Sequence, residues 1–167
     1  GTFSKTVAPG FRVGWICAAS ELVAKVVLAK QAGDLHSSTL NQMIVHETVS
    51  TGFGEHIATL RGVYGGRQAA MLAALEESMP EGVTWTRPDG GMFIWVELPE
   101  GMDATALLVT ALDEEGIAFV PGASFFADRS GGNFLRLNYT LATEREIADG
   151  IGRLGRLVYR EMTRMLS

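Results

Sequence analysis

The sequence has little of what would mark a disulfide-rich protein. Among its 167 residues there is one cysteine, Cys17, and one thiol cannot form an internal disulfide. This favours a reducing compartment, and we expect the protein to be cytoplasmic. Because Cys17 follows Trp15 and Ile16 in an apolar run, we expect its side chain to be buried and unreactive.

The sequence also lacks an excess of basic residues. Its 14 lysines and arginines stand against 19 aspartates and glutamates, which gives a formal net charge of −5. A surface that binds the phosphate backbone of nucleic acids normally carries a basic excess. We therefore expect no direct nucleic-acid binding by this chain.

No apolar run is long enough for a membrane-spanning helix, which needs about 20 residues. The apolar stretch 22–29 is interrupted by Lys25 and ended by Lys30, so we expect no membrane partner. The opening shows no signal peptide. The first residue is Gly1, and the segment that follows is typical of the middle of a domain, so we expect a fragment or a processed form of a longer protein.

Strand and helix patterns alternate along the first half of the chain. Residues 12–18 form an apolar run of strand length, and Ser20 is placed to cap the helix that follows. A second helix is predicted from Thr39 to Val49, and a third stretch of helical spacing covers residues 55–78. Three glycines in this last stretch weaken its middle, because each costs up to about 1 kcal/mol against alanine.

The second half of the chain reads as short strands between helices. Residues 83–86 and 92–98 are predicted to form a hairpin around a Pro-Asp-Gly-Gly turn. Asp103 is expected to cap a helix that ends at Gly116. Further strands are predicted at residues 117–120 and 134–139.

A final amphipathic helix is predicted after Thr143, which forms a capping-box pattern with Glu146. Mixed strands and helices without an internal repeat predict an α/β or α+β domain. The side chains expected to face the core are Trp15, Met43, Met71, Met92, Trp95, Leu107, Leu108, Ala111, Leu112, Ile147, Ile151, Leu154, Val158 and Met162.

The opening Gly-Thr-Phe-Ser-Lys places an amine beside two hydroxyl groups. Thr2 and Ser4 shortly precede Lys5, and Arg12 follows a Pro-Gly turn that can bring its guanidinium back towards them. Such a lysine can bind phosphate, act as a general base, or attack a carbonyl as a neutral amine. Hydroxyls and a forked cation suit a phosphate. An exposed lysine on a surface loop is the alternative, and residue types alone favour it.

Five sequence segments, taken together, favour a functional lysine over an exposed lysine on a surface loop. They are GTFSKTVAPGFRVGW, DLHSSTLNQ, TRPDGGMFIWVELPEG, IAFVPGASFF and NFLRLNYT. Together they resemble the class I and II aminotransferases of fold type I, in the branch of 2-aminoadipate and other lysine-pathway aminotransferases. The resemblance covers essentially the whole chain. GntR/MocR-type transcription regulators, which fuse such a domain to a winged-helix reader, share this branch.

The resemblance implies a pyridoxal 5'-phosphate enzyme. Lys5 matches the lysine that holds the cofactor and moves a proton between substrate carbon and cofactor. Thr2, Ser4 and Arg12 match the phosphate cradle. Arg136 matches the arginine that binds the substrate α-carboxylate, a task that suits a planar bidentate donor; a solvated strand arginine is the alternative. Residues 35–38 match a segment near the substrate side chain.

The resemblance also implies substrates, partners and domains. The expected reaction moves an amino group between 2-aminoadipate, or an aromatic or branched amino acid, and 2-oxoglutarate, and the expected assembly is a homodimer. Residues 1–32 would be a remnant of the large cofactor-binding domain, 33–60 connecting helices, and 61–167 the small C-terminal domain. The fold class implied is α/β, the tail of a large domain plus a small α+β domain.

One part of the family pattern is missing from the sequence. In the family, a long segment before the lysine supplies the aspartate under the pyridine nitrogen and the aromatic ring stacked on the cofactor. Without that aspartate the electron sink is lost, so we expect the chain alone to bind cofactor weakly and to transfer amino groups hardly at all. The effector-sensing domain of a regulator is the alternative function.

Two other patterns do not reach the level of a site. His36, His46 and His56 stand ten residues apart, a step that drifts around a helix, so we expect no metal centre. Paired glycines at 90–91 and 131–132 lack the spacing of a dinucleotide fingerprint. We interpret both pairs as turns.

Overall fold

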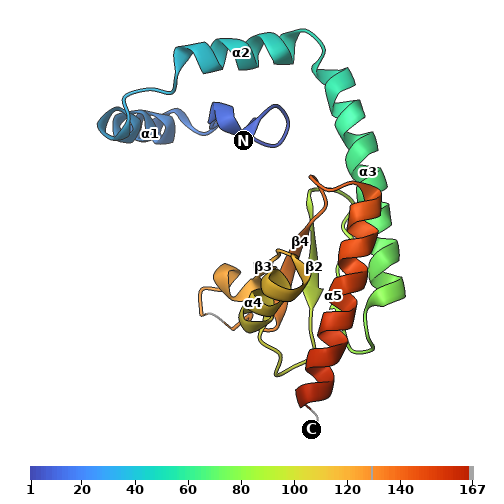
Figure 1. Cartoon of the computed structure of the whole chain (residues 1–167). Helices are drawn as coiled ribbons and strands as arrows, with labels where there is room; N and C mark the ends of the chain where they lie inside the picture. The colour runs from blue at the N-terminus through green and yellow to red at the C-terminus, as the bar shows by residue number, and fades with distance from the viewer. Residues whose placement is uncertain (129, 166–167) are drawn as a thin grey trace. The chain divides into compact units, whose positions relative to one another are not determined.

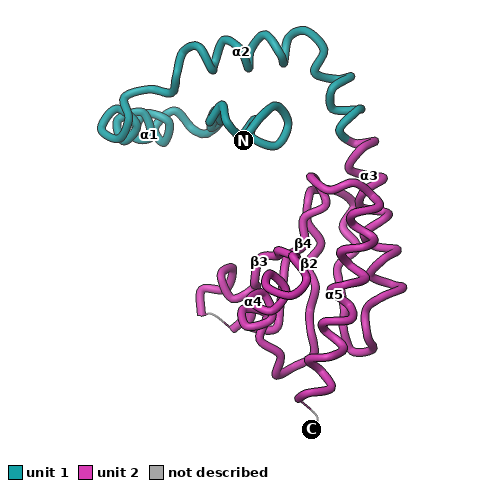
Figure 2. Tube along the Cα trace, in the orientation of Figure 1, with its two compact units in different colours: residues 1–60 teal, residues 61–167 magenta. Residues whose placement is uncertain are grey.

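The computed structural model describes residues 1–128 and 130–165. The chain divides into two compact units, Gly1–Leu60 (unit 1) and Arg61–Ser167 (unit 2). Figure 1 traces the elements along the chain and Figure 2 colours the two units. The boundary falls within one long helix, α3 (Phe53–Ser78), which contributes to both.

Unit 1 is a paired N-terminal loop followed by helices. Its elements are η1 (Pro9–Phe11), α1 (Ser20–Gly33), α2 (Thr39–Ser50) and the start of α3. The loop is closed by backbone hydrogen bonds, among them those from Phe3 N–H to Val13 O at 3.1 Å and from Trp15 N–H to Gly1 O at 2.9 Å. Ser38 caps α2, because its Oγ accepts the Asn41 N–H at 3.3 Å, as capping serines commonly do.

Two predictions of local structure in unit 1 are wrong. Residues 12–18 form no strand; their pairing is a single bridge between Gly14 and Thr2. A strand needs a hydrogen-bonded neighbour along its length, and here residues 1–3 offer one only to residues 13–15. Ser20 is the first residue of α1 and not its cap, since Ala19 takes that position and no side chain caps the helix.

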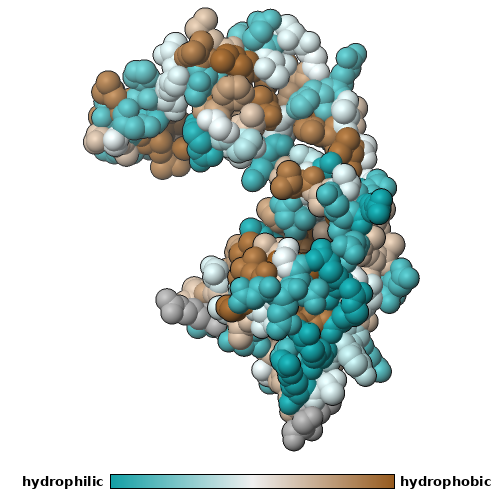
Figure 3. Space-filling view, viewed as in Figure 1, coloured by the Kyte–Doolittle hydropathy of each residue, from teal (hydrophilic) through white to brown (hydrophobic). Residues whose placement is uncertain are grey.

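The burial predicted for unit 1 is also wrong. Cys17 is exposed, and Trp15 and Met43 are 55% and 63% exposed. Val45 is the one buried hydrophobic residue among residues 1–60, all of which the structure describes. Figure 3 shows hydrophobic side chains at the surface of α1 and α2.

Unit 2 is built on a four-stranded antiparallel sheet in the order β1-β2-β4-β3. The strands are β1 (Thr84–Trp85), β2 (Phe93–Glu97), β3 (Val120–Pro121) and β4 (Phe134–Asn138). The predicted hairpin is confirmed, because β1 and β2 pair with Thr84 opposite Glu97. All four strands are shorter than predicted, and β3 shares only Val120 with the strand predicted at residues 117–120.

The helices of unit 2 begin and end as their caps predict. In α4 (Ala104–Glu115), Asp103 Oδ1 accepts the Thr105 N–H at 2.7 Å, and Gly116 closes the helix with φ +60°. Before α5 (Glu144–Met165), Glu146 accepts the Thr143 N–H at 2.8 Å and donates its own N–H to Thr143 Oγ1 at 3.3 Å. This is the reciprocal bonding of a capping box.

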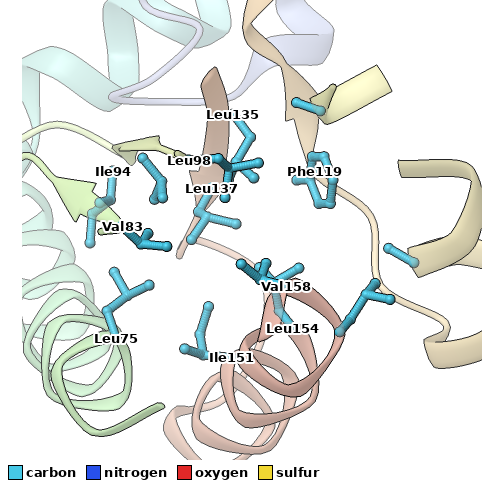
Figure 4. Close-up of a cluster of buried hydrophobic side chains, with 14 of the residues drawn as sticks. Leu75, Val83, Ile94, Leu98, Phe119, Leu135, Leu137, Ile151, Leu154 and Val158 are labelled. Atoms are coloured by element: carbon cyan, nitrogen blue, oxygen red, sulfur yellow. The ribbon is translucent and has the colours of Figure 1, made fainter. Parts of the chain in front are cut away.

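The core of unit 2 lies between one face of the sheet and helices α3, α4 and α5. Figure 4 shows Leu75 of α3 and Ile151 and Leu154 of α5 beside Ile94 and Leu137 of the strands. Alternate residues of β2 and β4 are buried, as a sheet with one covered face requires. The predicted inward face of α5 is confirmed.

The inward predictions for Leu112 and Trp95 are wrong. Leu112 is 49% exposed, and Trp95 is half-buried on the face of the sheet opposite the core, because the buried residues of β2 are its neighbours Ile94 and Val96. Helix α4 buries Ala104, Leu107 and Ala111, a narrower stripe than its apolar sequence suggests. The mixture of helices and an antiparallel sheet agrees with the α/β class predicted from the sequence.

Candidate functional site

Lys5 lies in the turn at the tip of the N-terminal loop. The turn spans residues 4–7 and is closed by the hydrogen bond from Val7 N–H to Phe3 O at 2.8 Å. The lysine is exposed, and within the described residues of unit 1 its amine has no hydrogen-bond or ion-pair partner. The loop therefore presents a free primary amine.

The two predicted hydroxyl ligands lie together at the base of this turn. Thr2 Oγ1 donates to Ser4 Oγ at 3.0 Å, and the Ser4 N–H donates to Thr2 Oγ1 at 3.1 Å. Thr2 is also the residue that bridges to Gly14. These short-range hydrogen bonds bring together two hydroxyl oxygens and one backbone amide, all from residues that precede Lys5.

Arg12 stands at the other end of the loop in an uncommon backbone conformation. It caps η1 with φ +53° and ψ +39°, and its Nη1 donates to Pro9 O at 3.2 Å. A non-glycine residue in this left-handed region costs on the order of 1–3 kcal/mol and is concentrated at functional sites. In the described part of unit 1, no hydrogen bond joins its guanidinium to Thr2 or Ser4.

Two side chains that were not predicted as site residues form hydrogen bonds with the N-terminal loop that carries Lys5. Asn41 of α2 donates from Nδ2 to Phe11 O at 3.1 Å. Near the start of α3, His56 Nε2 lies 2.9 Å from Thr6 O, and because a carbonyl only accepts, Nε2 carries the proton. These bonds join residues 30 and 50 positions apart, so no local pattern could have revealed them.

The segment 35–38 connects α1 to α2. Leu35 has φ +68°, and its N–H donates to Lys30 O at 3.0 Å, which closes the end of α1. The Ser37 carbonyl accepts from Gln42 Nε2 at 2.9 Å. The left-handed conformation at Leu35 serves the helix end, a position where glycine is more usual.

Arg136 lies in the middle of β4, in unit 2. Its backbone is paired with Trp95 of β2 on one side and Val120 of β3 on the other. The side chain is half-buried on the face of the sheet opposite the core, since its neighbours Leu135 and Leu137 are the buried residues of the strand. Arg136 is therefore not a freely solvated strand arginine.

The guanidinium of Arg136 is bounded by aromatic rings. Its Cζ lies 4.0 Å from the ring centre of Phe93 and 4.5 Å from that of Phe125. Its Nε is buried and has no hydrogen-bond partner among the described residues. Leaving such a donor unpaired costs free energy, so this position is suited to a ligand that brings an anionic oxygen.

Phe93 and Phe125 do not belong to the predicted set of site residues. Strand alternation could have placed Phe93 on the same face as Trp95. Phe125 could not have been found in this way, because it comes from the one-turn helix η2 (Gly122–Phe125).

The predicted site residues are thus divided between the units. Thr2, Ser4, Lys5 and Arg12 lie on one loop of unit 1, and Arg136 lies on the sheet of unit 2. Each group has a chemistry of its own: hydroxyls, an amine and a cation in unit 1, and an arginine held against rings in unit 2.

Local bonding and burial shift the pKa of several groups in unit 2, among them Asp128 and Tyr139. Hydrogen bonds from Ser130 lower the pKa of Asp128, in the loop that follows η2. Burial raises the pKa of Tyr139, at the end of β4. Neither residue belongs to the predicted set, and both shifts follow from local bonding or desolvation.

Two other kinds of feature are absent from residues 1–128 and 130–165. No cluster of three or more histidine, cysteine or acidic side chains has the geometry to hold a metal ion. No helix combines the length and the apolar character that crossing a bilayer requires.

Comparison with known proteins finds similar sequences over nearly the whole chain. The model of the family described as aminotransferase class I and II matches residues 1–154. Aromatic-amino-acid aminotransferase 1 of Thermococcus litoralis is 47% identical over 163 residues, which are 97% of this chain and 39% of that protein. This chain therefore spans about two fifths of that relative's length.

A solved structure supports the same conclusion. LysN, the α-aminoadipate aminotransferase of Thermus thermophilus complexed with N-(5'-phosphopyridoxyl)-L-leucine, superposes with a TM-score of 0.92 and is 47% identical. The match covers 96% of this chain and 41% of that one.

A relative of another kind is the uncharacterized HTH-type transcriptional regulator YdfD of Bacillus subtilis. It is 31% identical over 159 residues, 95% of this chain and 32% of that protein. The family match extends over residues 1–154, so it includes both the N-terminal loop with Lys5 and strand β4 with Arg136. This chain belongs to the aminotransferase class I and II family.

Proposed function

We propose that this chain is the C-terminal part of a pyridoxal-phosphate-dependent aminotransferase. The observation that carries the proposal is the loop of unit 1, where a free amine, two bonded hydroxyls and a guanidinium stand within twelve residues. The solved relative bound to a phosphopyridoxyl amino acid supports it. In this proposal, residues 1–32 come from the large domain, 33–60 connect, and 61–167 form the small domain.

The donor set fits the cofactor by its chemistry. Thr2, Ser4 and Arg12 would hold the phosphate, since hydroxyls and a guanidinium are its usual partners. Lys5 would hold the aldehyde covalently through Nζ. When bound, pyridoxal phosphate supplies an aldehyde that takes up amino groups and a ring that accepts the electron pair left on the substrate carbon.

Side chains of this chain would transfer the proton, bind the substrate carboxylate and support the loop that carries Lys5. Once the substrate amino group had displaced it from the aldehyde, the Lys5 amine would take the proton from the substrate α-carbon and deliver it to the former aldehyde carbon of the cofactor. Arg136 binds the substrate carboxylate and orients the molecule, which fixes the bond to be broken. Asn41 and His56 support the loop that carries Lys5 and Arg12, because they bond to the carbonyls of Phe11 and Thr6.

We propose 2-aminoadipate or an aromatic or branched amino acid as amino donor, and 2-oxoglutarate as acceptor, in a cytoplasmic homodimer. The names of the relatives support the donors. Because this chain spans about two fifths of those relatives, we propose that residues 1–167 alone bind the cofactor weakly and transfer amino groups hardly at all.

The test compares the 167-residue chain with the longest polypeptide that contains it. Amino transfer is measured from 2-aminoadipate and from an aromatic amino acid to 2-oxoglutarate. We expect turnover by the longer polypeptide and a loss of roughly 100-fold or more in Lys5→Arg, with Lys25→Arg as the matched control. Full activity of Lys5→Arg would contradict the proposal.

A regulatory function is the second candidate, because a helix-turn-helix regulator matches 95% of this chain. In that case the longer polypeptide binds pyridoxal phosphate and an effector without releasing a 2-oxo acid. A winged-helix segment before Gly1 in the reading frame would favour this candidate. Catalytic turnover with any of the proposed donors would exclude a purely sensory role.

A further inference from the structure

We infer that Phe93 and Phe125 are positioning residues that hold the Arg136 guanidinium in the orientation in which it receives a substrate carboxylate. The inference rests on the proposed function and deepens it. It concerns residues within unit 2 alone.

The first step is the contact between the guanidinium and the two rings. At 4.0 Å and 4.5 Å from the ring centres, the cation is well within the distance of about 6 Å at which a cation and an aromatic face attract. The attraction strengthens where water is excluded, and the Nε atom of Arg136 is buried.

The second step is what these rings leave free. Aromatic faces attract the cation but accept no strong hydrogen bond, so the donors of the guanidinium stay available. Within the described residues, Arg136 has no ion-pair partner, and its Nε has no hydrogen-bond partner. A carboxylate neighbour would have held the arginine equally well and would have competed with the substrate.

The third step is how the fold places Phe93. Arg136 is directly opposite Trp95, and Phe93 is opposite Asn138, so Phe93 is a diagonal neighbour of Arg136 on the same face. Diagonal pairs across antiparallel strands are within reach for aromatic and long side chains. The contact is therefore fixed by the register of β2 with β4.

The fourth step is how the fold places Phe125. Its helix η2 packs against β4 so closely that a Cβ on Gly122 would overlap the Cβ of Phe134 and would lie 2.8 Å from Gly131 O. Only a glycine allows this approach. Trp95 then contacts the Phe125 ring edge-on, with centres 5.3 Å apart and an interplanar angle of 80°, which holds Phe125 over the arginine.

The test uses the longest polypeptide that contains this chain, with the cofactor bound. Phe125→Leu and Phe93→Leu remove the ring but keep most of the bulk, whereas Phe125→Tyr and Phe93→Tyr keep the ring. Phe126→Leu is the matched control, because Phe126 contacts Trp95 and Phe134 in the same cluster but no cation contact joins it to Arg136 in the described structure.

We expect each leucine variant to raise the KM of both amino donor and 2-oxo acid by roughly 2- to 30-fold, the range of a cation–π contact. Cofactor affinity should stay unchanged, and the tyrosine variants should restore the KM to within about twofold. A second readout is the chemical shift of the Arg136 Nε–H proton in nuclear magnetic resonance. The neighbouring rings displace this chemical shift in the wild type, so it should change in Phe93→Leu and in Phe125→Leu.

Two results would overturn the inference. One is an equal rise in KM for Phe126→Leu and Phe125→Leu, which would indicate general damage to the cluster. The other is an unchanged KM in both leucine variants of an active enzyme, which would leave the proposed function intact. Failure of the proposed function is distinguishable, because then the wild-type polypeptide itself releases no 2-oxo acid while the Arg136 signal still reports on the rings.

Discussion

The two units differ in how chemistry and core are distributed. Unit 1 carries the free amine, the bonded hydroxyls and a strained arginine, yet Val45 is its one buried hydrophobic residue among residues 1–60. Unit 2 contributes one arginine to the predicted site, on a sheet backed by a continuous core. The comparison shows that an apolar sequence does not establish a core; paired strands and facing helices do.

The largest expected difference is in stability. Leu154 is 1% exposed within the core of unit 2, whereas Leu22 of α1 is 57% exposed. We expect Leu154→Ala to lower the free energy of unfolding by about 2–5 kcal/mol, and Leu22→Ala to change it by about 0.5 kcal/mol or less. Urea titration followed by circular dichroism measures both. Equal losses would break the comparison between the units.

A second prediction separates the roles of the two cations. Arg12→Gln should raise the dissociation constant of pyridoxal phosphate by roughly 10- to 150-fold, the value of charge-assisted hydrogen bonds, and leave substrate KM nearly unchanged. Arg136→Gln should do the reverse. Cofactor titration and steady-state kinetics of each variant check this in the longer polypeptide. If both variants changed the same constant, the assignment of one cation to each ligand would be wrong.

A third prediction concerns the contact between the end of α3 and α5. A Cβ at Gly155 would overlap the carbonyl of Ser78, whereas a Cβ at Gly150 would meet open space. We expect Gly155→Ala to destabilise unit 2 by about 1–3 kcal/mol through overpacking. Gly150→Ala should stabilise α5 by about 0.5–1 kcal/mol. Thermal denaturation of the two variants should therefore give shifts of opposite sign.

The smallest effect is expected at the start of α5. Hydrogen bonds from the Thr143 backbone and side chain lower the pKa of Glu146. A carboxyl whose pKa is lowered by folding adds stability above its ordinary pKa, and this is lost as the pH falls through the lowered value. Thr143→Ala should therefore destabilise the protein more at neutral pH than in acid. A cost that did not depend on pH would exclude this origin.

The sequence was most informative where structure is decided locally. Asp103, Gly116 and the pair Thr143 and Glu146 end or begin helices through bonds to near neighbours, and the structure confirms them. The apolar periodicity of α5 identified its buried face. Such features need only a few consecutive residues.

The errors lie where a distant partner decides. Residues 12–18 are apolar enough for a strand, but pairing with residues 1–3 supplies only one bridge. Asn41 and His56 bond to carbonyls far along the chain, and Phe125 reaches Arg136 from a separate one-turn helix. The resemblance identified the family and the candidate ligands, whereas the groups that hold these ligands required the structure.

The central claim is that the amine of Lys5 is the attachment point of pyridoxal phosphate. The 167 residues contain only two other lysines, Lys25 and Lys30, which serve as internal controls. The longer polypeptide is incubated with the cofactor, reduced with borohydride, digested and analysed by mass spectrometry. We predict that the phosphopyridoxyl label is found on Lys5. A label on Lys25 or Lys30, with Lys5 unmodified, would contradict the account.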